Sequence, residues 1–245
     1  MTLYGGNFLT ASLQGADLTS ARLMLADFTS AQLQGAVLSH ARLEGAILRD
    51  ADLEGADLQS SRLFSTDLSG AKIASADLRG ALVWRAAAPL ADPQGLADFE
   101  QMGLRAPDEL DLGSIKSLID RIADAKLKVR LEEGLQPIIN GRAGAGWAAT
   151  PDAQRWREMQ TASASMGDGY KIKLTEGLTR LACRALHANG SVAVGVGKRS
   201  LGPAFKGDLP TYYARLRGGD CAASRNVPPK FLSELGSAAD IARGQ

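Results

Sequence analysis

The stretch that decides the fold is residues 41–60, which read ARLEGAILRDADLEGADLQS. A leucine stands at every fifth position of this stretch, and an alanine precedes each leucine by two positions. Outward from here, the apolar position recurs without a gap from Leu3 to Val83, and the small position recurs from Gly6 to Ala81. A period of five matches neither the 3.6-residue period of a helix nor the two-residue period of a strand. The pattern therefore predicts a repeat architecture.

The repeated unit, Ala-(Asp/Asn/Arg)-Leu-x-x, resembles the pentapeptide-repeat family over about residues 3–85. Ala16-Asp17-Leu18 is a clear example of the unit. The resemblance implies a right-handed quadrilateral β-helix of about four coils, in which the small residue and the central apolar residue point inward. Physical reasoning agrees, because only a residue as small as alanine fits beside a stacked leucine in a narrow tube. Glycine at the fifth position, as in Gly55, suits the corner.

Beyond the repeat the sequence predicts helices, so the fold class is α+β by segment, a β-helix followed by a small all-α domain. Prolines after Trp84-Arg85 mark the boundary. We expect the β-helix over 1–85, a boundary and cap segment over 86–112, and the helical domain over 113–245. Ser114 is the expected cap of a helix that continues to about residue 135, and Thr150-Pro151 is the expected start of a second. Further helices are expected near 170–187, 209–216 and 229–235.

Folding the repeat at 20 residues per turn predicts which side chains share a face. One face stacks three arginines, and hydrophobic side chains follow the core residue on the same face. The neighbouring face carries Asp17, Val37, Asp57 and Asp77. Arginine and aromatic residues are typical of protein-recognition surfaces. The candidate partner-binding residues are Arg22, Arg42, Arg62, Met24, Phe64 and Trp84.

Two interpretations of this arginine face stay open. It could bind a protein partner, or it could be neutralised by Glu44 and neighbouring aspartates while Phe64 and Trp84 lie under the chain's own downstream segment. We therefore predict a non-enzymatic protein–protein interaction or scaffold module, whose arginine face docks either its own helices or a partner of unknown identity.

The alternative function implied by the resemblance is a DNA-mimicking modulator of a type II topoisomerase, as in fluoroquinolone-resistance proteins that bind DNA gyrase. Duplex DNA carries about one negative charge per 1.7 Å. Residues 1–85 carry nine acidic and seven basic side chains, a net charge of −2, and the remainder of the chain carries +3. A nearly neutral rod is a poor mimic of DNA. The whole-chain charge of +1 also makes nucleic acid an unlikely partner.

The repeat is already running at Leu3, so the first coil has no cap in the sequence. An uncapped coil exposes backbone groups and core side chains to another chain. This predicts either end-to-end self-association or a longer protein with earlier repeats, and the second is favoured.

Two cysteines, Cys183 and Cys221, can form one disulfide or remain separate buried thiols. The segments around them also resemble the soluble tail of proteobacterial membrane-anchored pentapeptide-repeat proteins. That resemblance implies a bacterial envelope location, on the periplasmic side of a membrane-associated assembly, as an alternative to the cytoplasm. No run of 18 apolar residues occurs, so no membrane span is expected within these residues.

We expect no enzyme activity, no cofactor and no metal site. The stretch Gly195-Val196-Gly197-Lys198-Arg199-Ser200 has arginine where a phosphate-binding loop needs Ser or Thr after the lysine. The two histidines, His40 and His187, have no neighbouring ligand or nucleophile in sequence, and the cysteines lack metal-ligand spacing. Paired carboxylates such as Glu132-Glu133 are typical of solvated surface charge.

Overall fold

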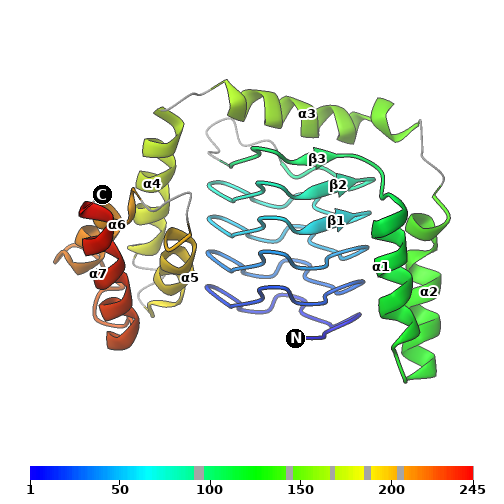
Figure 1. Cartoon of the computed structure of the whole chain (residues 1–245), viewed down its shortest axis with the longest axis horizontal. Coiled ribbons are helices and arrows are strands. Elements are labelled where there is room, and N and C mark those ends of the chain that lie inside the picture. The colour runs from blue at the N-terminus through cyan, green and yellow to red at the C-terminus, as the bar shows by residue number, and fades with distance from the viewer. Residues whose placement is uncertain (91–96, 142–145, 166–168, 185–188, 203–206, 245) are drawn as a thin grey trace.

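The computed structural model describes residues 1–90, 97–141, 146–165, 169–184, 189–202 and 207–244, without the side chains of 169–172. It shows a stack of coils with helices on both sides and across one end (Figure 1). Parallel bridges join residues 20 apart along the repeat, for example Asp17 to Val37 and Arg42 to Arg62. The five-residue pattern therefore produces a regular ladder.

Three short strands continue this ladder as a parallel sheet: β1 (Arg62–Phe64), β2 (Leu82–Trp84) and β3 (Gly103–Leu104). Their register shows that the β-helix extends beyond the expected boundary at residue 85. Asp77 pairs with Asp98, and Leu82 pairs with Gly103, which is an offset of 21. Residues 97–104 are thus part of a coil, where we expected a boundary and cap segment.

The core of the coils is the inward series of alanine and leucine side chains, which are fully buried from Ala21 onward. The fifth residue of each unit turns the corner with a positive φ angle, at glycine and at other residues alike. Gly55 has φ 68° and Ser60 has φ 54°. Aspartate or asparagine before the core residue stabilises this turn, because its side chain accepts a hydrogen bond from the amide two residues on, as Asp57 does from Gln59.

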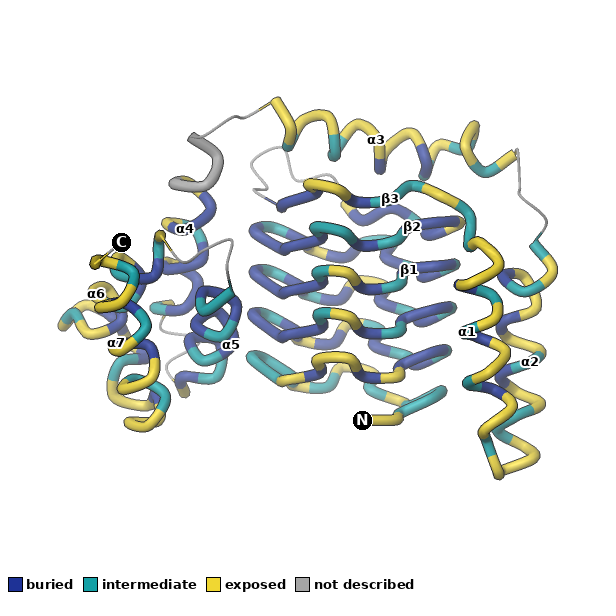
Figure 2. The backbone as a smooth tube through the Cα atoms, viewed as in Figure 1, coloured by how far each residue is buried: buried dark blue, intermediate teal, exposed yellow. Residues whose placement is uncertain are grey.

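The two ends of the coil stack differ. Helix α3 (Pro151–Ala164) crosses one end, and its side chain Trp156 is fully buried there (Figures 1 and 2). The indole Nε1 of Trp156 donates to the carbonyl oxygen of Ala86 at 3.2 Å, and its ring meets Phe99 edge-on. At the other end the core side chains Leu3 and Phe8 are only half-buried. Self-association through this first coil stays a prediction.

We expected residues 113–245 to form one separate helical domain. The structure instead places these helices on different sides of the coils. Figure 1 shows α1 (Glu109–Asp120) and α2 (Ala125–Ile139) along one side of the coils. On the opposite side lie α4 (Gly169–Ala182), α5 (Ser191–Ser200), α6 (Leu209–Arg217) and α7 (Pro229–Arg243), and we call these four the C-terminal module. A short 3₁₀ helix, Trp147–Ala149, precedes α3.

The predicted starts of α3, α6 and α7 are confirmed at Pro151, Leu209 and Pro229, and the helix predicted from Ser114 is wrong. The single helix expected from Ser114 to residue 135 is two helices, and the first begins at the cap Asp108, which forms a capping box with Asp111. Thr150 caps α3 as predicted, with Pro151 at its first position. Helix α5 was not expected, and its N-cap residue is Gly190.

Candidate interaction surfaces

The structure brings together most of the predicted arginine face, but under the chain's own helices. Met24, Phe64 and Trp84 are at most 2% exposed. They form one hydrophobic cluster with the side chains of α1 and α2, namely Ile115, Ile119, Leu131, Leu135 and Ile138. Of the two interpretations left open by the sequence, the structure shows the internal one for these three residues.

The arginines of this face pair mostly within the chain. The guanidinium of Arg42 donates to Glu44 Oε1 at 2.8 and 2.6 Å and to the hydroxyl of Ser114 at 2.7 Å. Arg62 lies 2.9 Å from the carboxylate of Asp111 in α1. Burial raises the pKa of Glu44 despite its two arginine neighbours.

Arg22, in contrast, is exposed, alone among the three predicted arginines. The other two arginines, Arg42 and Arg62, contact α1 through Ser114 and Asp111.

The aspartate face lies beneath the C-terminal module. Lys198 Nζ is 2.7 Å from Asp17 Oδ2, and this hydrogen bond lowers the pKa of Asp17 to about 2. Arg199 is buried, donates to the carbonyl of Ser75 at 2.6 Å and lies 3.5 Å from Asp77. The Lys-Arg pair that resembled part of a phosphate-binding loop thus binds carboxylates of this chain.

Three carboxylates of consecutive coils, Asp57, Asp77 and Asp98, stack on this face with Arg79 and Arg199 beside them. Arg79 Nη2 donates to Asp77 Oδ2 at 2.6 Å. Burial raises the pKa values of Asp57 and Asp98, and the nearby charge of Asp77 adds to both shifts.

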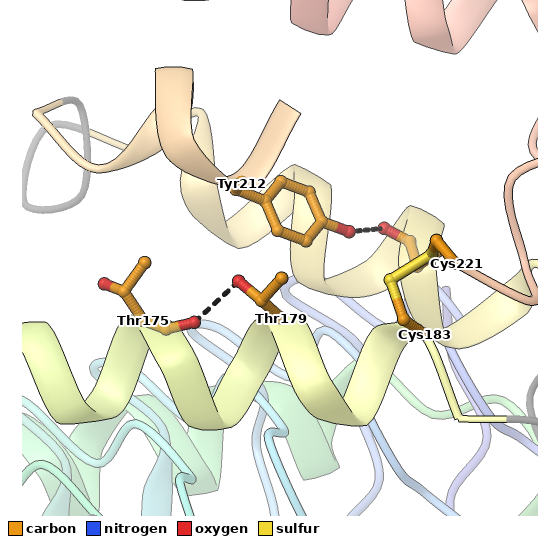
Figure 3. The surroundings of a disulfide bond; sticks show 6 residues. Thr175, Thr179, Cys183, Tyr212 and Cys221 are labelled. Carbon is orange, nitrogen blue, oxygen red and sulfur yellow. Dashed lines mark hydrogen bonds between the residues drawn. A yellow bond between two sulfur atoms is a disulfide. The ribbon is translucent and has the colours of Figure 1, made fainter. Parts of the chain in front are cut away.

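A groove opens on the C-terminal module between α4, α6 and α7. Its volume is about 1110 Å³, and one wall is the disulfide between Cys183 and Cys221 (Figure 3). The Cα atoms of the two cysteines are 4.5 Å apart. Behind this wall, Tyr212 donates from its hydroxyl to the carbonyl of Ala193 at 2.6 Å, which fixes α6 against α5.

The groove presents charges of both signs. Its lining includes three basic and three acidic side chains, Arg180, Arg215, Arg243, Glu176, Asp208 and Asp220. Thr175 donates to Asp208 at 2.9 Å, and Thr179 donates to the carbonyl of Thr175 at 2.7 Å, so the floor of the groove is held in place (Figure 3). Sequence reasoning missed this site, because its members are spread over 69 positions with no local pattern.

Among the residues that the structure describes, no group of three or more His, Cys, Asp or Glu side chains could hold a metal ion. Within the same residues, no helix combines the length and the apolar character needed to cross a bilayer.

Comparison with known proteins agrees with the coil architecture. A family model described as pentapeptide repeats matches residues 26–63 and 46–84. The chain belongs to the pentapeptide-repeat family through this part of its sequence. No curated protein matches the chain significantly.

Among solved structures, the chain is similar to HetL, a pentapeptide-repeat protein involved in heterocyst differentiation regulation from the cyanobacterium Nostoc sp. strain PCC 7120. The identity is 30%, the TM-score is 0.26, and the match covers 43% of this chain and 47% of HetL, so the chain spans about half the length of that protein.

The pentapeptide-repeat protein Rfr23 from the cyanobacterium Cyanothece 51142 is 25% identical, with a TM-score of 0.23 and coverage of 42% of this chain and 80% of Rfr23. QnrB1, a plasmid-mediated fluoroquinolone resistance protein, is 14% identical with a TM-score of 0.23, and the match covers 51% of this chain and 90% of QnrB1.

Proposed function

We propose that this protein is a non-enzymatic protein-interaction module in which the β-helix is the scaffold and the C-terminal module presents the binding groove. The groove beside the disulfide is the observation that carries this proposal. It is open to solvent, large enough for several side chains of a partner, and lined by charged groups of both signs. Such a lining suits a segment of a protein that itself carries acidic and basic side chains.

The rest of the molecule supports a scaffold role for the coils. One side of the stack is covered by α1 and α2, and the other by α4 and α5 (Figure 1). The arginine face is mostly buried, so we propose the groove as the site of partner binding. Among the six predicted partner-binding residues, Arg22 alone is exposed.

A site-specific crosslinking experiment tests the location of the site. A photoreactive residue at Thr211, which lines the groove, should capture a defined partner from the native cell extract. The same residue at Leu110, which is 85% exposed on α1, is the control for non-specific capture. The proposal predicts a product that is specific to position 211.

Charge reversal sharpens the result. The double variant Arg180→Glu and Arg215→Glu should abolish that product. Arg225→Glu, an exposed arginine outside the groove lining, should leave it unchanged. Equal capture from both photoreactive positions, or equal loss in both charge variants, would show that the groove is not the site.

The alternative function, a DNA-mimicking topoisomerase modulator, has less support. Residues 1–104 carry twelve acidic and seven basic side chains, and this net charge of −5 is in the direction that a DNA mimic needs, but helices cover both long sides of the coils. Inhibition of gyrase supercoiling by the purified protein, at concentrations near equimolar with the enzyme, would favour this alternative over the groove.

A further inference from the structure

A row of glycines lies where the C-terminal module contacts the coils. Gly15, Gly35 and Gly55 stack at one corner of the β-helix, with φ between 63° and 68°. Helix α5 lies directly on this corner. A Cβ atom placed on Gly195 would come within 1.9 Å of the carbonyl oxygen of Gly35, so the helix could not approach as closely with any other residue.

Apolar side chains of the module contact the coils at the same corner. A Cβ placed on Gly35 would meet the side chain of Val192, and one placed on Gly55 would meet those of Leu178 and Leu181. The coil contributes only backbone at these points. Contact with glycine backbone buries little apolar area compared with a large side chain, so it contributes little hydrophobic stabilisation.

The module has a core of its own. Its buried hydrophobic side chains form one cluster that runs from Leu174 to Ala239 and includes no residue of the coils. The disulfide between Cys183 and Cys221 closes 38 positions of chain that contain both α5 and α6. The buried cluster and the disulfide of the module therefore do not depend on side chains of the coils.

Opposite charges hold the two parts together. Residues 169–245 carry twelve basic and five acidic side chains, a net charge of +7, against −5 for residues 1–104. Three of those cations reach carboxylates of the coils: Lys198 to Asp17, Arg199 to Asp77, and Arg184 to Glu54 with two hydrogen bonds of 2.7 and 2.8 Å.

We propose that the C-terminal module docks reversibly, and that its release uncovers an acidic surface of the coils that binds a basic segment of a partner protein. We define this acidic surface as Asp17, Glu54, Asp57, Asp77 and Asp98. In the docked state Lys198, Arg199 and Arg184 occupy it, so the partner that fits it carries consecutive Lys and Arg residues as α5 does.

The energetics favour a reversible contact. Exposed ion pairs such as Lys198 with Asp17 contribute little to stability and weaken as salt screens them. The buried pair of Arg199 and Asp77 gains little net free energy, since desolvation of both charges offsets their attraction.

Gly195→Ala is the variant that separates docking from folding. Alanine is a better helix former than glycine, so α5 itself should be strengthened, while its new methyl group collides with Gly35 backbone that cannot move aside. Gly113→Ala in α1 is the matched control, because a Cβ there meets nothing within 4 Å.

The distance between spin labels on non-canonical residues at Lys72 of the coils and Lys230 of α7 reports the docked state in the full chain. We expect it to lengthen in Gly195→Ala and in the double variant Lys198→Glu and Arg184→Glu. It should stay as in the wild type in Gly113→Ala. The disulfide and the circular dichroism spectrum should be unchanged in all of them. An unchanged distance in both docking variants, or loss of helix in step with the distance, would overturn the proposal.

Binding of a basic probe tests the uncovered surface. A labelled peptide with the sequence SVAVGVGKRS, which is residues 191–200, should bind the Gly195→Ala protein about tenfold or more tighter than the wild type. The same peptide with glutamate in place of its Lys and Arg should not bind. If the module opens but the two peptides bind the Gly195→Ala protein equally, the acidic surface is not a site for basic segments.

Discussion

The two helical groups that flank the coils are attached by different forces. On one side α1 and α2 share a hydrophobic cluster with Met24, Phe64 and Trp84 of the coils. On the other side the C-terminal module keeps its own core and meets the coils through glycine backbone and ion pairs. One scaffold thus carries a fused helical pair and a docked helical module.

The outward-facing residues of a repeat can thus determine how firmly a neighbouring helix is attached to the coils. Large apolar side chains on one face remove water and merge two cores, and their burial is worth several kcal/mol. A glycine corner beside carboxylates permits close approach without a shared core.

Removal of the largest apolar anchor should break the fused side. Trp84→Ala should lower the free energy of unfolding by about 3–5 kcal/mol, because Trp84 is 2% exposed between β2 and α1–α2 and its loss leaves a cavity. Denaturant unfolding followed by circular dichroism measures this change. A loss below about 1 kcal/mol would mean that α1 and α2 are not fused to the coils by this cluster.

Removal of the disulfide should affect the docked module alone. Cys183→Ala together with Cys221→Ala should lower the stability of the module by about 2–4 kcal/mol on a chain-entropy argument, given the 38-residue separation. Hydrogen exchange should show faster opening of α4 to α7 with the coils unchanged. Equal acceleration in the coils would contradict the independence of the module.

Neutralisation of a buried carboxylate should stabilise the docked side. Burial raises the pKa of Asp57 in the folded protein above its unfolded value, so the folded state is favoured at low pH and this advantage is lost as the pH rises through the folded pKa. Asp57→Asn should therefore raise the thermal midpoint at neutral pH and flatten its pH dependence. Asparagine still accepts the turn hydrogen bond, as Asn7 does from the amide of Leu9.

Reversal of one exposed ion pair should have the smallest effect. Lys198→Glu should cost at most about 1 kcal/mol at low salt, since both side chains are about one third to one half exposed. The charge swap that combines Lys198→Glu with Asp17→Lys should recover the stability lost in Lys198→Glu alone. A defect of equal size at 1 M salt would show that the pair does not act through its charge.

The sequence was sufficient to predict the coils, because each five-residue unit repeats the same local rule. The inward alanine and leucine series and the glycines at some corners are visible in the letters, whereas the aspartate hydrogen bond in the turn and the positive φ at corners without glycine emerged from the structure. The C-terminal limit of the coils was harder to predict. The rungs at Asp98 and Gly103 follow an irregular spacing of 21, which the strict repeat does not reveal.

The helices were predicted less well wherever tertiary contacts decide the outcome. Helix α5 contains Gly195 and Gly197, which lower its intrinsic helix propensity, and Gly195 is required by contact with Gly35 of the coils. The groove likewise depends on packing of three helices and a disulfide. The sequence correctly predicted which residues share the arginine face. It did not predict that α1 and α2 cover this face.

Hydrogen exchange of the full protein at low and high salt tests whether α1 and α2 are attached to the coils by a shared core and the C-terminal module by charge. We expect that raising NaCl from 50 mM to 1 M speeds amide exchange in α5 and at the glycine corner, while the amides of α1 and α2 that face the coils keep their protection. Equal response of the two sides, or no response on either, would contradict the distinction between a fused pair and a docked module.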